Sequence, residues 1–101
     1  MMIEDPARAI ATNTLKVSAK SNPNSVAGAL AAVLRQRDTV EIQAVGAGAI
    51  NQAVNAVAIA RTYLKGSRID LNCVPSFIDV EINGNEHTGI SLAVERRILP
   101  A

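Results

Sequence analysis

Apolar and polar residues alternate in three stretches of the chain, and each alternation predicts a half-buried β-strand. The first covers residues 14–20 and the second covers residues 40–44. The third runs over residues 69–82, where Pro75 cannot donate a ladder hydrogen bond and therefore implies an edge, a break or a bulge. In each stretch apolar side chains mark one face, so we expect a sheet that buries one face and leaves the other to solvent.

Between the strands, apolar residues recur with helical spacing. Asn22 suits an N-cap and Pro23 suits the first helical position, so a first amphipathic helix is predicted from there to about Arg37. A second helix is predicted from about residue 49 to residue 65, closed by Gly66. Larger apolar residues mark one stripe of this helix: Ile50, Val54, Val57 and Leu64. Small residues that permit close packing mark another stripe: Ala49, Ala53, Ala56 and Ala60.

Asn83-Gly84 is a strong signal for a two-residue hairpin turn, and the alternation over residues 90–94 predicts the returning strand. The resulting order is β-α-β-α-β-β. We therefore predict an α+β two-layer sandwich with a four-stranded mixed sheet, both helices on one face and right-handed crossovers.

The length of 101 residues fits one small domain. We divide the chain into a flexible leader (1–13), a single domain (14–97) and a short tail (98–101). No apolar run reaches the length of a membrane span, and the N-terminus lacks the apolar stretch expected of a secretory signal. The single Cys73 cannot form an internal disulfide, which favours a cytoplasmic location. A domain of this size is modestly stable alone, which favours self-association.

The net charge of +1 is too small for the strongly basic composition of many nucleic-acid binders, but the charges are unevenly distributed. Residues 14–37 sum to +4, residues 61–68 to +3, and residues 69–95 to −5. Such segregation produces either a basic end and an acidic end or an ordinary charged solvent shell.

Enzymatic chemistry has few candidate residues. His87 is the single histidine, and we expect it to be exposed just beyond the hairpin turn. We expect Cys73 to be a small buried hydrophobe. One histidine and one cysteine do not make a metal site, and nothing supplies a nucleophile with its base. Asp79 and Glu81 share a strand face, which we interpret as solvated. We predict no catalytic residues, no metal and no cofactor.

Two strand-to-helix turns are candidate anion sites, because backbone N–H groups at a helix N-terminus attract negative charge. One contains Gly46, Gly48 and Asn51, and it lacks the spacing of a nucleotide-binding glycine loop. The alternative is that its small residues serve helix packing.

The other turn contains Lys20, and here the alternative to an anion site is ordinary capping of the helix. Both turns fall at the same end of the sheet. Together with the strand residue Lys16, the candidate phosphate-binding residues are Lys16, Lys20, Ser21, Asn22, Asn24, Gly46, Gly48 and Asn51.

The solvent-facing side of the sheet is predicted to lack a stacking platform for bases, since Phe77 is the one candidate aromatic. Val45 and Ala93 on this face favour self-association over part of it. Any nucleic-acid contact is therefore expected through loop edges and phosphates. The predicted exposed residues of this face are Lys16, Ser18, Lys20, Glu41, Gln43, Asp79, Glu81, Ser91 and Glu95.

Residues 15–30 (LKVSAKSNPNSVAGAL), 41–54 (EIQAVGAGAINQAV) and 56–61 (AVAIAR) closely resemble the stage V sporulation protein S family. The resemblance implies a small regulator of sporulation with an Alba-like fold. Alba proteins are dimeric nucleic-acid binders that use the first strand-to-helix turn and a long hairpin. Lys20 matches that turn, and the hairpin tip is matched by Asn83, Gly84, Asn85 and His87.

These observations lead to one principal hypothesis and two alternatives. The principal hypothesis is a non-enzymatic, cytoplasmic regulator that binds DNA or RNA through phosphates as a homodimer or homotetramer, without a membrane partner. The first alternative is a homo-oligomeric scaffold for protein interactions that binds no nucleic acid. The second is a sensor of a small phosphate or nucleotide ligand at the turn over residues 46–51.

Overall fold

The computed structural model describes residues 14–100, so the predicted leader and Ala101 lie outside the described residues. Its elements follow the predicted order, and the fold class is confirmed. They are β1 (Thr14–Val17), α2 (Pro23–Leu34), β2 (Thr39–Ala44), α3 (Ala47–Leu64), the 3-10 turn η1 (Lys65–Ser67), β3 (Ile69–Ile82) and β4 (Asn85–Ile98).

The four strands form one mixed sheet in the order β1-β2-β4-β3. β1 pairs with β2 in parallel, whereas β4 pairs with β2 and β3 in antiparallel fashion. Asn83 and Gly84 both have positive φ angles, of 52° and 81°, as the tight turn between β3 and β4 requires. Pro75 lies within an unbroken strand at the sheet edge, so of the three predicted alternatives the edge is the one observed.

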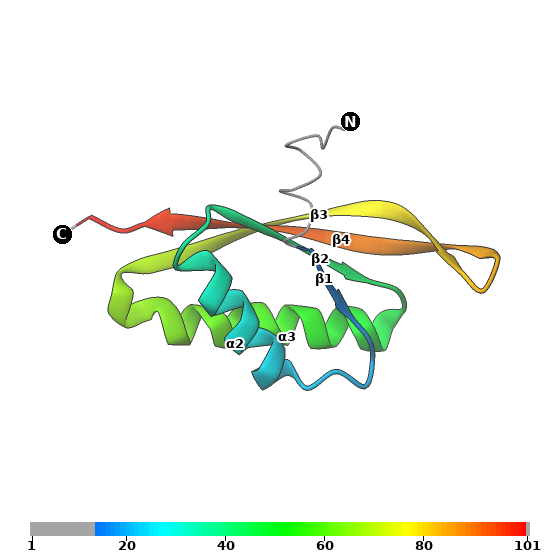
Figure 1. Cartoon of the computed structure of the whole chain (residues 1–101), viewed down its shortest axis with the longest axis horizontal. Coiled ribbons are helices and arrows are strands. Elements are labelled where there is room, and N and C mark those ends of the chain that lie inside the picture. Colours follow the sequence, from blue (N-terminus) through cyan, green and yellow to red (C-terminus); the bar gives the residue numbers. More distant parts are fainter. Residues whose placement is uncertain (1–13, 101) are drawn as a thin grey trace, which may run out of the picture.

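Both helices cover the same face of the sheet, and the β3–β4 hairpin extends beyond them (Figure 1). The helices pack on each other and on the central strands, where the buried core lies. The largest fully buried side chains are Leu30, Leu34, Ile42, Leu64 and Val94.

The two helices bury different kinds of face. α2 buries leucines with alanines, as its apolar spacing predicted. α3 buries chiefly its small-residue stripe: Ala49, Ala53, Ala56 and Ala60. Val54, one of the larger apolar residues of this helix, is 52% exposed. Methyl groups allow α3 to approach α2 closely, and this is the packing role that the stripe indicated.

The end of α3 differs from the prediction. Gly66 does not close the helix, because the chain continues through the 3-10 turn and reverses at Arg68, which has a φ of 60°. A left-handed conformation is uncommon for arginine. Here the Arg68 backbone is held by hydrogen bonds in both directions, accepting from Leu99 N and donating to Lys65 O.

The prediction that Cys73 is buried was wrong, since Cys73 is exposed. It lies opposite Val94 on the helix side of the sheet, but β3 is the edge strand and only its first residues lie under α3. Ile69 and Leu71 are buried there, and from residue 72 onward β3 is largely uncovered.

The predicted exposed face also needs correction. Ser76 pairs with Ser91, and successive strand side chains alternate between faces. Asp79 and Glu81 therefore lie on the opposite face from Ser91 and Glu41. The prediction failed because it assigned the apolar residues of this stretch to a helix-covered face, whereas no helix covers the outer hairpin.

Candidate nucleic-acid interface

The two strand-to-helix turns lie side by side in the structure. A Cβ atom built on Gly48 would lie 2.9 Å from the Cβ of Ala19. The side-chain amide of Gln52 donates a hydrogen bond of 3.2 Å to the carbonyl oxygen of Ala19. Residues 16–25 and 43–52, here called the rim, thus form one continuous surface at the end of the sheet where both helices begin.

At the first turn, side chains already occupy the backbone donors. Asn22 Oδ1 accepts hydrogen bonds from the backbone N–H groups of Asn24 (2.8 Å) and Ser25 (3.3 Å). Ser21 Oγ accepts from the backbone N–H of Ser18 at 2.9 Å. The capping alternative therefore describes the role of Asn22, and the first amides of α2 are satisfied within the turn.

At the second turn, the backbone N–H donors at the start of α3 differ from those of α2 in their capping. Gly46 is the N-cap of α3 with a φ of 93°, and no side chain among residues 14–100 caps this helix. The φ angle needs glycine, because a side chain rarely adopts that region. Gly48 and Asn51 are both exposed on the first turns of α3. The N-terminal amides of α3 are therefore the backbone donors that the rim offers to an anion.

The two lysines of the predicted site are both exposed. Lys20 lies in the rim, and its backbone N–H donates to Ser18 Oγ at 3.2 Å. Lys16 lies one strand position before buried Val17 and lines a pocket of about 330 Å³ with Gln43. Glu81 of the hairpin lines the same pocket, so a carboxylate shares the surroundings of Lys16.

The hairpin tip extends away from the rest of the fold, at the right of Figure 1. Asn83 and Gly84 form the turn, and the other two predicted tip residues, Asn85 and His87, are exposed on β4. Just behind the turn, Glu81 pairs directly with Glu86. Two like charges in a cross-strand pair repel each other, and they also repel an approaching phosphate. Asp79 adds a third exposed carboxylate to the hairpin.

Glu41 is a polar centre of the solvent-facing sheet side. Its carboxylate accepts hydrogen bonds from Ser91 Oγ (2.7 Å), Gln43 Nε2 (3.2 Å) and Thr14 Oγ1 (3.3 Å). The hydrogen bond from Ser91 is the main cause that lowers the pKa of Glu41, and partial burial opposes it. Ser91, predicted as exposed, is buried at 6% exposure on the central strand β4. This centre joins three strands and offers no donor to a phosphate.

Within residues 14–100, no group of three or more His, Cys, Asp or Glu side chains is placed to hold a metal ion. The described helices include none with the length and apolar character needed to cross a bilayer.

Replacing Gly48 by alanine tests whether the two turns fit closely. The new Cβ meets Ala19, so we expect Gly48→Ala to lower the free energy of unfolding by about 1 kcal/mol. Adding Ala19→Gly removes the opposing methyl group, so the double variant is expected to lose less than the two single variants together. Urea unfolding of all four proteins gives this coupling. Strictly additive losses contradict the close contact.

The fold is that of an Alba-like protein. The structure of Alba from Thermoplasma volcanium matches this chain with a TM-score of 0.57 at 14% sequence identity. The match covers 82% of this chain and 96% of the Alba chain. Residues 13–97 also match the family described as Stage V sporulation protein S (SpoVS). The chain therefore belongs to the stage V sporulation protein S family, and this membership implies a sporulation-related role.

Proposed function

We propose that this protein is a non-enzymatic regulator that binds nucleic acid through the phosphate backbone at the rim. The observation that carries the proposal is the close contact of the two turns. It brings the turn that contains Lys20 to the N-terminus of α3, which no side chain among residues 14–100 caps. The Alba-like fold is compatible with this function. The lone cysteine, which has no partner for an internal disulfide, supports action in the cytoplasm.

In this proposal Lys16 and Lys20 neutralise phosphates, and the first amides of α3 donate hydrogen bonds to phosphate oxygens. The contacts carry little sequence information, because phosphates are the same at every step of the polymer. The solvent-facing side of the sheet has a hydrogen-bonded carboxylate, Glu41, at its centre. Base stacking on that face is therefore not part of the proposal.

The salt dependence of binding tests the role of the two lysines. On duplex DNA each neutralised phosphate contributes about −0.9 to the slope of log K against log salt concentration. We therefore expect the double variant Lys16→Ala/Lys20→Ala to reduce the magnitude of the slope by about 1.8, similarly for all sequences. Fluorescence anisotropy with duplex DNA, single-stranded DNA and RNA at several salt concentrations measures the slope.

The matched control is Lys16→Arg/Lys20→Arg, which keeps both charges and is expected to keep the slope. A wild-type protein that binds none of the three nucleic acids at low salt contradicts the proposed function. An unchanged slope in the alanine variant contradicts the role of the lysines, and a change confined to sequence preference does the same.

A second candidate function is a homo-oligomeric scaffold, and the free edge of β3 favours it. Phe77 is 80% exposed and Val74 is 63% exposed, on opposite faces of this edge strand. A second copy of the chain covers both residues if two β3 edges pair about a two-fold axis. Because Pro75 has no N–H to donate, this pairing depends on side-chain burial more than on a continuous hydrogen-bond ladder. Self-association without binding of DNA or RNA favours the scaffold.

A further inference from the structure

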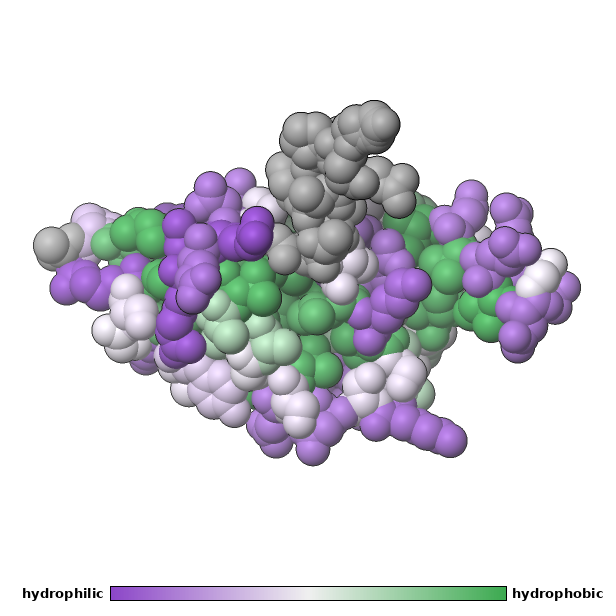
Figure 2. All heavy atoms as spheres, in the orientation of Figure 1, coloured by the Kyte–Doolittle hydropathy of each residue, from purple (hydrophilic) through white to green (hydrophobic). Residues whose placement is uncertain are grey.

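Charged side chains of the described residues separate along the molecule. We call the end formed by residues 34–38, 61–70 and 95–98 the basic end. It contains seven Lys and Arg residues and three Asp and Glu residues, a net charge of +4. Figure 2 shows strongly hydrophilic side chains gathered at the left, over the turn between α2 and β2. Both helices finish at this end, which is opposite to the rim.

The rim and the hairpin have the opposite balance. Residues 16–25, 43–52 and 78–89 contain two lysines and three carboxylates, a net charge of −1. Long-range attraction of a polyanion follows the net charge of a surface. The rim alone therefore gives little of that attraction, and the basic end gives most of it.

Three separate segments form the basic end, and hydrogen bonds join them. Arg35 at the end of α2 donates to the carbonyl oxygen of Tyr63 in α3 at 3.4 Å. The backbone N–H of Leu99, just after β4, donates to the carbonyl oxygen of Arg68 at 2.8 Å. Cations that are far apart in the sequence thus share one surface.

Two of the seven cations are held by carboxylates. Arg96 contacts Asp38 at 3.1 Å, and Arg61 contacts Asp70 at 2.6 Å with a second hydrogen bond of 3.2 Å. The hydrogen bonds from Arg61 are the main cause that holds the pKa of Asp70 below its ordinary value. These pairs neutralise two of the three acids. At the basic end, five exposed cations remain outside the ion pairs formed among residues 14–100: Arg35, Arg37, Lys65, Arg68 and Arg97.

The helix dipoles offset only part of the positive charge of these five cations. Each helix C-terminus is equivalent to about half a negative charge, so α2 and α3 together offset about one cation. Glu95 offsets another. About three positive charges therefore remain at the basic end.

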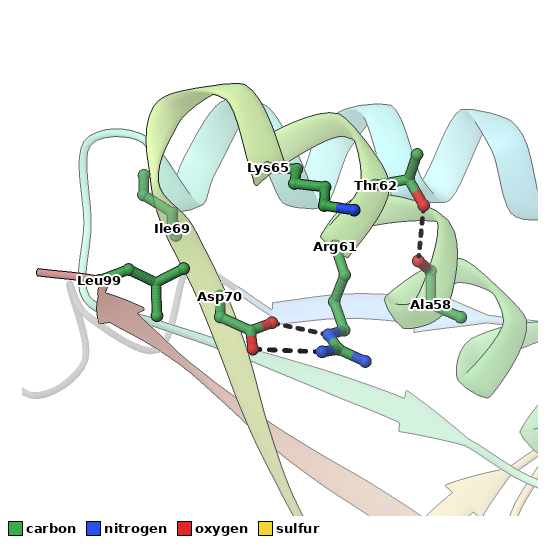
Figure 3. A pocket seen from close by; sticks show the side chains of 7 residues that line it. All are labelled: Ala58, Arg61, Thr62, Lys65, Ile69, Asp70 and Leu99. Atoms are coloured by element: carbon green, nitrogen blue, oxygen red, sulfur yellow. Dashed lines mark hydrogen bonds and ion pairs between the residues drawn. The ribbon is translucent and has the colours of Figure 1, made fainter. Parts of the chain in front are cut away.

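The remaining cations have chemistry suited to phosphate. Four of the five are arginines, whose planar guanidinium groups donate paired hydrogen bonds to phosphate oxygens. The fifth, Lys65, lines a pocket of about 300 Å³ together with Thr62 and the Arg61–Asp70 pair (Figure 3). This pocket forms a recess near Lys65, and the carboxylate of Asp70 lines it as well. Cations on three elements match a polymer of phosphates better than a single small anion.

We propose that the basic end is a second nucleic-acid-binding surface of this protein, and the one that supplies most of its electrostatic affinity. The proposal rests on the proposed function, because it assumes that the chain binds nucleic acid. It differs in location, since the basic end contains none of the rim residues. At the basic end phosphates contact the exposed arginines and Lys65, whereas at the rim they contact the lysines and the amides of α3.

The test compares two variants that remove charge at opposite ends. The basic-end variant is Arg37→Ala/Lys65→Ala/Arg97→Ala. These three side chains are exposed and donate no hydrogen bond within residues 14–100, so the fold is expected to remain intact by circular dichroism. The rim variant is Lys16→Ala/Lys20→Ala. Anisotropy with a fluorescent DNA duplex between about 50 and 200 mM salt gives the slope for each protein. A charge-conserving control replaces Arg37 and Arg97 by lysine.

We expect the basic-end variant to reduce the magnitude of the slope by about 2.7, more than the rim variant, with the lysine control close to wild type. If wild type binds and the basic-end variant keeps its slope, this inference fails while the proposed function stands. If the slope of log K against log salt concentration falls in the basic-end variant and not in the rim variant, the inference stands and the role of the rim lysines fails. Absence of wild-type binding overturns both. Binding to phosphatidylserine vesicles but not to duplex also overturns the inference in favour of a membrane partner.

Discussion

Replacing Phe77 by serine is expected to weaken self-association about a hundredfold or more. Phe77 is 80% exposed on the free edge of β3, and a symmetric dimer formed there buries two copies of it. Burial of one phenylalanine side chain contributes about 1.5–3 kcal/mol, so a dimer that loses both rings loses about 3–6 kcal/mol. The folded monomer loses little, because the ring makes few contacts within its own chain.

Sedimentation equilibrium over a range of protein concentrations measures this effect. Val54→Ser is the matched control, since Val54 is also an exposed apolar residue but lies on α3. The control is expected to associate like wild type. Equal weakening by both variants indicates general loss of surface hydrophobicity, and no weakening by Phe77→Ser rejects β3 as the interface.

Replacing Gly89 by alanine is expected to lower the free energy of unfolding by about 2 kcal/mol. A Cβ atom at Gly89 would lie 2.8 Å from the carbonyl oxygen of Ala44 and 2.9 Å from Cγ2 of Val45. The first neighbour is backbone of the central strand β2, which cannot move without disturbing its pairing with β4. The added methyl group therefore pushes the hairpin away from the end of β2.

Gly28→Ala provides the control, because it makes the same chemical change where nothing lies within 4 Å of the new atom. Gly28 lies on the exposed side of α2, where alanine is expected to stabilise the helix by about 0.5–1 kcal/mol. Urea denaturation of both variants should thus give shifts of opposite sign. A Gly89→Ala protein as stable as wild type would show that β4 and β2 are not in close contact at this position.

The element order was predictable from the sequence because its signals are local. Alternation, the Asn22-Pro23 helix start and the Asn83-Gly84 turn each act within a few residues. The pairing of β3 with β4 follows from the two-residue turn, which fixes the register over the whole hairpin.

The errors concern which side chains the tertiary structure covers. Cys73 alternates as a buried residue should, but it lies on the edge strand where no helix reaches. Asp79 and Glu81 were assigned to a face by the apolar character of their neighbours, whereas strand continuity with Ser76 fixes the opposite face. Local patterns give the two faces of a strand and do not say how far the helix layer extends.

The candidate site was predictable in part. The topology predicted that the two turns meet, and Ala19 does contact Gly48. The sequence left open whether the first amides of α2 bind an anion or are capped. In the structure Asn22 Oδ1 accepts a hydrogen bond from the backbone N–H of Asn24, so capping is observed there. The unpaired cations of the basic end were visible only as charge runs, because their assembly depends on contacts such as that of Arg35 with Tyr63. Binding at either end stays a prediction.

The alanine face of α3 has a consequence for the geometry of the rim. Alanine has no side-chain rotamers to lose on folding, so packing this face carries almost no conformational entropy penalty beyond the backbone. The first buried alanine, Ala49, follows Gly48 directly, so the contact with Ala19 adjoins the buried alanine face of α3. The spacing between the two turns is therefore set during folding, and binding of an anion there, as proposed, would require no rearrangement of the two turns.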